Sequence, residues 1–316
     1  MNKVTVVGSY NKGLTITTDR VPNWGETLEG SNFTTSHGGK GSNQAVASKR
    51  LGAEVNFIGA LGEDDFGKNG YEMLKNEGID VSGIKIVDNE STGIGIIFLD
   101  ENGENCILID KGANQHVTVN YVETLRYIIE QSDVLVIQLE IPIEAVKHAM
   151  KIAKDKGVIV LFNPAPATEE AKTLLQYADI INPNETELLL LNGLEVNKVL
   201  DEKQCINLAR NLLEEGPDEV IVTRGEKGII HVTLEGSEVV DSYSVTSKDS
   251  TGAGDAFTGA LAYSLSNNIS VAGSLQLALA AGSYCVTKYN VLEGLANYDT
   301  LLKFMEGKYE ECIFKS

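Results

Sequence analysis

The strongest constraint on the fold of this 316-residue chain is a regular alternation of short apolar runs with amphipathic stretches. Compact runs of Val, Ile and Leu are typical of strands covered on both faces, and they predict strands at residues 4–9, 55–61, 134–139, 158–162 and 220–223. Patterns with helical spacing predict helices at residues 67–77, 143–156, 168–177 and 201–214. The alternation indicates βαβ units, and therefore an α/β fold with a mainly parallel central sheet flanked by helices.

Two stretches interrupt this alternation. Residues 14–35 contain Pro22, Gly25 and Gly30 among short strand-like pieces, and residues 92–109 are typical of a hairpin with a polar turn through Asn102 and Gly103. Neither stretch has room for a helix. We therefore expect a small β-sheet lid, formed by residues 11–35 and 92–109, over one edge of an α/β core formed by residues 1–10, 36–91 and 110–316.

The composition restricts the kinds of partner and environment. The chain has 26 Lys and Arg against 45 Asp and Glu, a formal net charge of −19, so it lacks the basic surface that binds nucleic acid or anionic membranes. No apolar run approaches the roughly 20 residues that span a bilayer, and the first ten residues do not resemble a signal peptide. The cysteines show no metal-binding spacing: Cys106, Cys205, Cys285 and Cys312. We expect a reduced, cytoplasmic protein with no nucleic-acid or membrane partner.

A run of small residues lies in the last third of the chain, where Gly252, Ala253 and Gly254 precede Asp255. Apolar residues recur at helical spacing beyond it, so a helix is expected to begin there. Small residues at a helix N-terminus let backbone N–H groups approach an anion, which the partial positive charge of the helix end attracts. Asp255 alone could simply complement the helix dipole, but that role does not require the preceding small residues.

A second glycine-rich segment, residues 38–45, reads Gly-Gly-Lys-Gly-Ser-Asn-Gln-Ala. It is not a P-loop, because Gly41 follows Lys40, and no buried strand precedes it. A helical stretch follows and ends at Gly52. The glycines are expected to bring the backbone close to another group at a helix start, although a tight turn alone would explain them equally well.

Together these segments resemble the two signatures of the ribokinase family of carbohydrate kinases. The first signature matches at Gly39, Gly41, Asn43, Ala45, Gly52 and Gly62. The second matches residues 249–255 and 259–261, and segments 22–27, 163–167 and 182–187 are also similar to that family, so nearly the whole chain is covered. The resemblance implies transfer of the γ-phosphoryl group of ATP to a sugar hydroxyl.

The resemblance also implies a role for individual residues. Asp255 would accept the hydroxyl proton, and the N–H groups of Gly252, Ala253 and Gly254 would stabilise developing charge in an anion hole. The sugar-binding positions of the family fall on Asn11, Gly39, Asn43 and Glu140, with Lys40 near the transferred phosphate. Glu140 also follows the predicted strand 134–139, at the strand end where parallel sheets bind ligands. The alternatives are a solvated loop carboxylate and a solvated lysine.

For the nucleotide and the metals, the resemblance implies three further groups. Asn184 and Glu187 match an Asn-x-x-Glu that lies by the phosphates and supports Mg²⁺, and they are one helical turn apart. The nucleotide-binding loop of the family falls on Thr223, Gly225 and Gly228, although an ordinary hairpin turn would give the same pattern. Asp249 matches an acidic residue that helps hold K⁺. Homodimerisation through the lid is also implied.

The chain departs from the family in the sugar-binding segment. Ribokinases have Asn-x-Asp where this chain has Asn11-Lys12-Gly13. Residues 11 and 13 of an extended segment face the same way, so Gly13 removes a carboxylate expected to bind ribose hydroxyls and is expected to leave space. A lost charged hydrogen bond costs roughly 1.5–3 kcal/mol. We therefore expect a substrate that differs from ribose at that corner: another pentose, a hexose or ketose, or a substituted sugar.

A second departure and several alternatives remain. Asn290 and Gly294 stand where the family usually has Gly and Ser beside K⁺, so potassium activation is not assured by the resemblance. A nucleoside kinase of the same fold would suit the space at Gly13. A non-catalytic sugar- or nucleotide-sensing protein is disfavoured by the intact Asp255 and its glycines, and an NAD-dependent oxidoreductase by the lack of G-x-G-x-x-G after the first strand.

Overall fold

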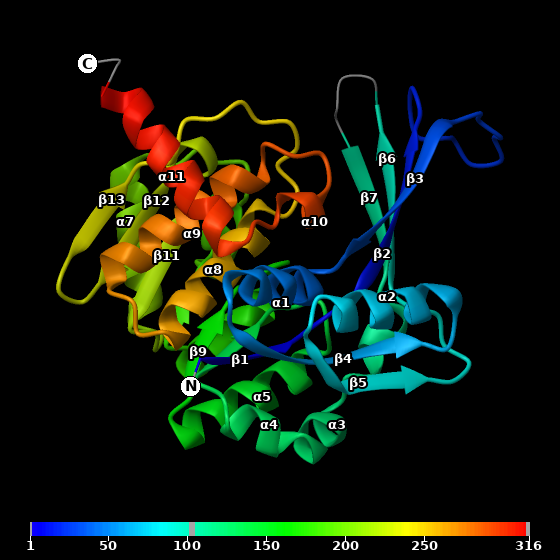
Figure 1. The fold of residues 1–316 in the computed structure, drawn as a ribbon, viewed down its shortest axis with the longest axis horizontal. Helices are drawn as coiled ribbons and strands as arrows, with labels where there is room; N and C mark the ends of the chain where they lie inside the picture. The colour runs from blue at the N-terminus through cyan, green and yellow to red at the C-terminus, as the bar shows by residue number, and fades with distance from the viewer. Residues whose placement is uncertain (1, 101–104, 314–316) are drawn as a thin grey trace.

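The computed structural model describes residues 2–100 and 105–313, whose strands form two separate sheets (Figure 1). The larger sheet has nine strands in the described residues. In spatial order these are β13 (Ser237–Val240), β12 (Ile229–Thr233), β11 (Glu219–Thr223), β10 (Ile180–Ile181), β9 (Ile159–Phe162), β8 (Val134–Ile137), β1 (Lys3–Val7), β4 (Glu54–Gly62) and β5 (Asp80–Val87). All neighbours pair in parallel except β11 with β12 and β12 with β13.

Helices cover both faces of this sheet. One face carries α3 (Val119–Thr124), α4 (Arg126–Glu130), α5 (Ile143–Lys156), the 3₁₀ helix η2 (Glu169–Tyr177), α6 (Glu185–Leu191) and α7 (Glu202–Leu213). The other carries α1 (Lys40–Leu51), α2 (Asp65–Asn76), α8 (Ala253–Ser266), α9 (Val271–Cys285) and α11 (Tyr298–Ile313). Shorter elements are η1 (Gly112–His116), η3 (Gly225–Lys227) and α10 (Val291–Gly294). The predicted α/β fold with a mainly parallel sheet is therefore confirmed.

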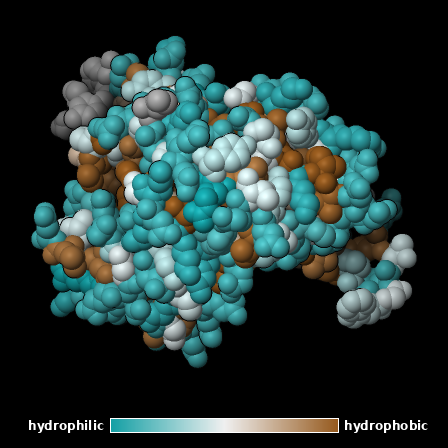
Figure 2. Space-filling view, turned by 90° about the horizontal axis from the view of Figure 1, so that it is seen from below, coloured by the Kyte–Doolittle hydropathy of each residue, from teal (hydrophilic) through white to brown (hydrophobic). Residues whose placement is uncertain are grey.

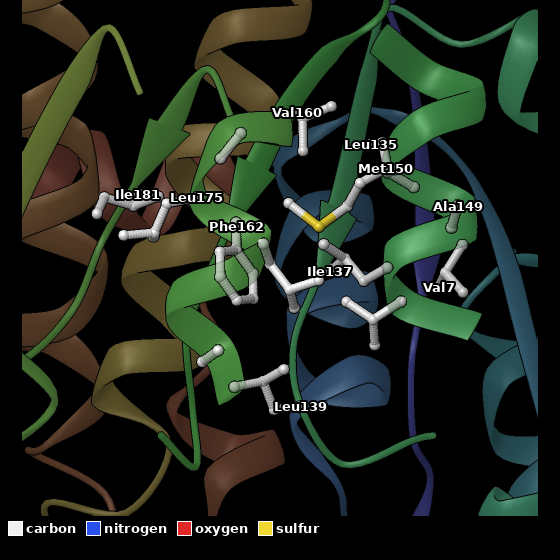
Figure 3. Close-up of a cluster of buried hydrophobic side chains, with 14 of the residues drawn as sticks. Val7, Leu135, Ile137, Leu139, Ala149, Met150, Val160, Phe162, Leu175 and Ile181 are labelled. Atoms are coloured by element: carbon white, nitrogen blue, oxygen red, sulfur yellow. The ribbon is translucent and has the colours of Figure 1, made fainter. Parts of the chain in front are cut away.

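The core explains why the apolar runs became central strands. On one face, Met150 and Ala149 of α5 lie over Ile137 and Phe162 of β8 and β9 (Figure 3), and all four side chains are fully buried. A strand covered on both faces needs apolar residues at successive positions rather than at alternate ones. This is why residues 134–137 read as a continuous apolar run.

Most of the predicted elements have close to the expected bounds. Helix α5 has the predicted bounds, and α2 begins slightly before the predicted residue 67 because the Asp64 side chain caps it by accepting from the Gly67 N–H (2.7 Å). Residues 169–177 form a 3₁₀ helix instead of an α-helix. No helix within the described ranges is long and apolar enough to cross a membrane.

The second sheet stands beside α1 and α2 and projects away from the body (Figure 1). Its four strands, in spatial order, are β3 (Ser31–Gly38), β2 (Asn11–Thr17), β6 (Ile94–Leu99) and β7 (Asn105–Asp110). Both predicted segments therefore pair into one sheet, with β3 continuing past residue 35 to Gly38. The expected turn through Asn102 and Gly103 lies outside the described residues. We call these four strands the small sheet.

The surface agrees with the acidic composition. Figure 2 shows one face of the molecule as mostly hydrophilic, with small and separated hydrophobic patches. The net charge of −19 arises from 45 acidic against 26 basic side chains. Any binding site for a strongly anionic ligand must therefore be built locally, against the field of the whole protein.

Candidate active site

The predicted site residues gather at the carboxyl ends of β1 and β8, below the small sheet. Strand β1 lies between β8 and β4: the chain continues from β1 to β4 and β5 on one side, and β8 and the later strands are added on the other side. In open α/β sheets, ligands bind outside the strand ends at such a switch point. Ser9 follows β1, Glu140 follows β8, and both approach Lys40 at the start of α1.

Asp255 lies in the first turn of α8 and is 7% exposed. Each of its carboxylate oxygens accepts a hydrogen bond from a side chain of α1. Asn43 Nδ2 donates to Oδ2 (2.8 Å) and Gln44 Nε2 donates to Oδ1 (3.0 Å). Two residues more than 200 positions away in the sequence thus fix the orientation of this carboxylate.

Burial and neighbouring groups shift the pKa values of three residues of the site. Burial raises the pKa of Asp255, and the nearby Lys40 ammonium and the two amide hydrogen bonds offset only part of that rise. Burial also raises the pKa of Glu187, again partly offset by Lys40. For Lys40 burial acts to lower the pKa, but the carboxylates of Asp255, Glu140 and Glu187 outweigh it and the pKa is raised. The half-buried Lys40 therefore lies in the field of three carboxylates, which favours its charged form, and its place near the transferred phosphate stays a prediction.

The N-terminus of α8 has the features of an anion-binding site. Gly252 precedes the helix in a left-handed conformation (φ 81°), and within the described part of the chain no side chain caps this helix end. A Cβ at Gly252 would lie 2.5 Å from a methyl carbon of Val291, so glycine is required there. A Cβ at Gly254 would meet no atom within 4 Å. Packing within the described chain does not require the second glycine, and its effect is to leave the helix end open to a ligand.

Glu140 is held by donors from three segments. Its Oε2 accepts hydrogen bonds from the Ser9 hydroxyl, from the Lys40 N–H (2.9 Å) and from Asn11 Nδ2 (3.4 Å). The alternative of a solvated loop carboxylate is therefore wrong. Asn11, the first residue of β2, joins this cluster to the base of the small sheet.

The glycines of the first signature have a structural role in addition to any role in binding. Gly39 has φ 97°, and a Cβ there would lie 2.7 Å from the Asn11 nitrogen and 3.0 Å from the Ser9 oxygen. A Cβ at Gly41 would lie 2.6 Å from the Ser9 nitrogen. These glycines thus allow the start of α1 to lie close to the backbone of the segment that follows β1. The start of α1 packs directly on that segment, which brings Lys40 beside Glu140.

A buried amide network supports Asp255 and was not predicted from the sequence. Gln44, fully buried, also donates to Asn163 Oδ1 (3.1 Å) and accepts from Gln138 Nε2 (2.6 Å). Asn163 Nδ2 in turn donates to the Asn182 carbonyl (3.1 Å). Gln44, Asn163 and Asn182 all lie in segments that resemble the family. The amide residues in these segments were the only sign in the sequence that a polar network could form.

Three buried oxygens in and around this network have no hydrogen-bond partner within the described residues: Asn43 Oδ1, Gln138 Oε1 and Asn182 Oδ1. The Oδ1 of Asn43 is buried and accepts no hydrogen bond within the described residues, whereas its Nδ2 donates to Asp255. A buried polar atom without a partner is costly unless a ligand or water supplies one. This acceptor fits the sugar-binding role expected for Asn43, which stays a prediction.

The predicted nucleotide-binding residues lie together at the neighbouring strands. Asn184 caps α6, and it forms a capping box with Glu187, in which each side chain accepts from the other residue's N–H (2.8 Å in both directions). Asn184 also bridges to Thr223 at the end of β11. Gly225 (φ 57°) and Gly228 (φ 81°) shape the turn into β12, so this segment is a hairpin turn as well as the predicted loop.

The carboxylate of Asp249, the residue predicted to help hold K⁺, makes only a local hydrogen bond within the described residues. Asp249 Oδ1 accepts from the Thr251 N–H (2.8 Å), and the Asp249 N–H donates to the Val286 carbonyl (3.3 Å). A Cβ at Gly294 would lie 2.7 Å from the Cys285 sulfur, so the serine usual in the family would not fit without a shift. Across residues 2–100 and 105–313, no group of three or more His, Cys, Asp or Glu is placed to hold a metal ion.

The expectation of empty space at Gly13 is wrong. Ser36 lies directly opposite Gly13 in the β2–β3 pairing, and an ideal Cβ on Gly13 would lie only 2.4 Å from the Ser36 hydroxyl oxygen. The neighbouring strand therefore fills the place that glycine would otherwise leave. The corner at Gly13 therefore gives no reason to favour a nucleoside as the substrate.

Comparison with known proteins agrees with the geometry. The family model described as pfkB family carbohydrate kinase matches residues 1–296. A ribokinase of Haemophilus influenzae is 38% identical over 96% of this chain and 98% of its own, and a deoxyribokinase of Salmonella typhi is 36% identical over 90% and 92%. The structure of Arabidopsis thaliana ribokinase complexed with ribose and ATP superposes with a TM-score of 0.87 at 30% identity, covering 95% of this chain and 97% of that one.

Proposed function

The chain belongs to the pfkB family of carbohydrate kinases, and we propose that it phosphorylates a pentose with Asp255 as the base. It is an ATP-dependent sugar kinase of the ribokinase and deoxyribokinase type. One observation carries the assignment of the base. The Asp255 carboxylate is buried and held by two amides of α1, at the open N-terminus of α8.

The proposed reaction is an in-line transfer. The sugar hydroxyl oxygen attacks the γ-phosphorus of ATP, the bond from that phosphorus to the bridging oxygen breaks, and ADP leaves. Asp255 accepts the hydroxyl proton, and burial suits it to this role by raising its pKa. The N–H groups at residues 252–254 stabilise the charge that develops on the transferred group.

Local charge supports ATP binding in a protein of net charge −19. The Lys40 ammonium and the open end of α8 both attract phosphate oxygens within the screening length of about 8 Å. Asn184, Thr223, Gly225 and Gly228 are proposed to line the nucleotide site, and the bridge between Asn184 and Thr223 supports this by bringing their segments together.

The donor set fits Mg²⁺ bound mainly through water and phosphate oxygens. Glu187 commits one carboxylate oxygen to the Asn184 N–H, and its other oxygen accepts no hydrogen bond in the described part of the chain. Mg²⁺ commonly takes one or two carboxylates with several waters and substrate phosphates. When bound, the ion would neutralise charge on the phosphates. Potassium at Asp249 is a separate proposal, and unchanged activity after replacement of K⁺ by a large organic cation would contradict it.

The small sheet is proposed to act as the lid and as a dimer surface. The face carrying Asn11 and Gly13 is turned to the site, and closure over it would exclude water that competes for the phosphoryl group. The opposite face is apolar and partly exposed at Leu14, Ile16, Ile96, Phe98 and Leu108. We call these five residues the outer apolar face, and a second copy of this chain is its proposed partner. The cytoplasmic location stays a prediction.

The test of the kinase assignment is ATP consumption with a panel of pentoses, hexoses and nucleosides. We expect turnover with a pentose, and we expect Asp255→Asn to lower kcat by about 10²- to 10⁴-fold with little change in ATP affinity. Near-normal turnover of that variant would exclude Asp255 as the base. A nucleoside preferred over every sugar would contradict the substrate class.

A further inference from the structure

The corner of the sugar site at Gly13 is occupied by a side chain from the neighbouring strand. Gly13 on β2 and Ser36 on β3 are directly opposite in an antiparallel pair, so both face the same side of the small sheet. The position of an ideal Cβ on Gly13 lies 2.4 Å from the Ser36 hydroxyl oxygen and 3.7 Å from the Ile97 Cδ1. At this spacing the two positions cannot both carry a side chain pointing to the site without a shift.

The Ser36 hydroxyl is available to a ligand. Ser36 is half-buried, and its hydroxyl makes no hydrogen bond to another described residue. Residues at alternate positions of a strand share a face, so Asn11 and Gly13 face the site together, and Asn11 hydrogen-bonds to Glu140. Ser36 therefore presents a free hydroxyl on the face of the sheet that covers the proposed sugar site.

We propose that Ser36 determines the sugar specificity of this enzyme, and that the Gly13–Ser36 pair favours a pentose with one hydroxyl fewer than ribose, such as 2-deoxyribose. This inference rests on the proposed pentose kinase function. A carboxylate offers two acceptor oxygens and can hold two neighbouring sugar hydroxyls at once. A serine offers a single uncharged oxygen, so a second sugar hydroxyl adds less binding free energy at a serine than at a carboxylate. A sugar without that second hydroxyl therefore loses less affinity here.

The relatives of this chain include kinases named for ribose and for deoxyribose, so they do not decide which of the two sugars it prefers. Proteins called ribokinase and deoxyribokinase are similar to this chain at 38% and 36% identity. Overall similarity therefore does not separate the two sugars, and a difference is expected in side chains that contact the sugar. Because the Ser36 hydroxyl fills the position next to Gly13, a carboxylate at residue 13 requires that hydroxyl to shift or to be removed.

The test compares kcat/KM for ribose and 2-deoxyribose in four proteins: unmodified, Ser36→Ala, Gly13→Asp and the double variant Gly13→Asp with Ser36→Ala. We expect the unmodified enzyme to use 2-deoxyribose at least as well as ribose. Ser36→Ala should lower kcat/KM for the preferred sugar about 3- to 10-fold, mainly through KM, because one neutral hydrogen bond is lost. The double variant should shift the ratio toward ribose by about tenfold or more, and Gly13→Asp alone should be less active than the double variant.

The matched control is Thr35→Ala. Thr35 is the preceding residue of β3, is exposed and pairs with Leu14 on the opposite face, so the ratio of the two sugars should not change. Thermal unfolding of each variant separates loss of folding from loss of specificity, and calorimetric titration with each sugar alone measures binding without turnover.

Each outcome bears on a different statement. If the unmodified protein phosphorylates no pentose, the proposed function is wrong. If it phosphorylates pentoses but Ser36→Ala leaves kcat/KM and binding of both sugars unchanged, only the role of Ser36 is wrong. A strong preference of the unmodified enzyme for ribose that persists in all variants would overturn the inference in the same way.

Discussion

The catalytic corner of the large sheet and the small sheet above it hold their polar groups in opposite ways. At Asp255, both carboxylate oxygens are bonded to side chains from α1, and one of these, Gln44, is itself bonded to Asn163 and Gln138, which follow β9 and β8. On the small sheet, Ser36 is bonded to nothing within the described chain, and Ile107 and Leu108 are 53% and 64% exposed. The carboxylate in the body is thus oriented before any ligand binds, whereas the small sheet leaves a hydroxyl and apolar side chains open to the proposed sugar and the proposed second copy.

We therefore expect substitutions in the two regions to have different effects. Changes in the body should lower kcat and stability, because they remove partners from buried groups. Changes in the small sheet should alter KM, specificity or assembly, and should leave the fold intact.

The largest expected effect is that of Lys40→Met. The ammonium lies in the field of three carboxylates and, in the proposed mechanism, beside the transferred phosphate. We expect kcat to fall about 100-fold or more, as for the loss of other charge-stabilising groups. Because Lys40 lowers the pKa of Asp255 and Asp255 must be deprotonated, the acidic limb of the kcat–pH profile should move to higher pH.

Lys40→Arg is the matched control, because it keeps the positive charge. Its acidic limb should stay near that of the unmodified enzyme even if kcat falls. An unchanged acidic limb in Lys40→Met would show that Lys40 does not tune the base.

The second expected effect is a loss of stability in Gln44→Leu. This change removes a fully buried amide and leaves Asp255, Asn163 and Gln138 each without one partner. An unsatisfied buried polar group costs about 1–3 kcal/mol, so the free energy of unfolding in urea should fall by at least that amount. Gln276→Leu, on the exposed outer side of α9, should change it much less. Equal effects of the two changes would argue against a network that matters to the fold.

The third prediction separates the two faces of the small sheet with one substitution made at adjacent positions. Ile96 belongs to the outer apolar face and Ile97 lies beside Gly13 on the site face. Ile96→Asp should dissociate the proposed dimer, as measured by light scattering, because it places charge in an apolar interface. Ile97→Asp should leave the dimer intact and raise the KM for the sugar. A monomeric unmodified protein, or dissociation by both variants, would contradict the assignment of faces.

The smallest expected effect lies at the far edge of the body. Burial acts to lower the pKa of His231, but hydrogen bonds to Glu219 (2.6 Å) and Glu238 (3.0 Å) outweigh it and the pKa is raised. A raised folded-state pKa means that the stabilisation is complete below the unfolded value of about 6.5 and is lost as the pH rises through the folded value. The Tm should therefore fall by about 1–3 °C over that window, and His231→Gln should lose this pH dependence. A Tm that rises with pH there would reverse the sign and contradict the prediction.

The positions of the candidate catalytic residues were predictable from the sequence because the features that mark them are local. The run from Gly252 to Asp255 is contiguous, so a helix start, open N–H groups and a carboxylate follow from adjacent residues. The same holds for Asn184 and Glu187, which form one capping box. The roles of these residues in catalysis stay predictions, but their positions agree with them.

Long-range polar partners were not predictable in this way. Gln44 meets Asp255, Asn163 and Gln138 because α1, α8 and two strand ends converge, and no spacing in the sequence encodes that convergence. The strands β5, β10 and β13 also escaped prediction. Of these, β10 has only two residues and β13 is largely exposed, so neither shows the continuous apolar run of a buried strand.

By itself the sequence determined the α/β class, the two glycine-rich helix starts and the position of Asp255, because each depends on neighbouring residues and on the repeat of strand and helix. It also showed that Gly13 lacks the expected carboxylate. Only the tertiary structure decided what takes its place, because the pairing of β2 with β3 sets Ser36 against Gly13. Strand register decides which side chain occupies a binding corner, and register is set by the packing of the whole sheet.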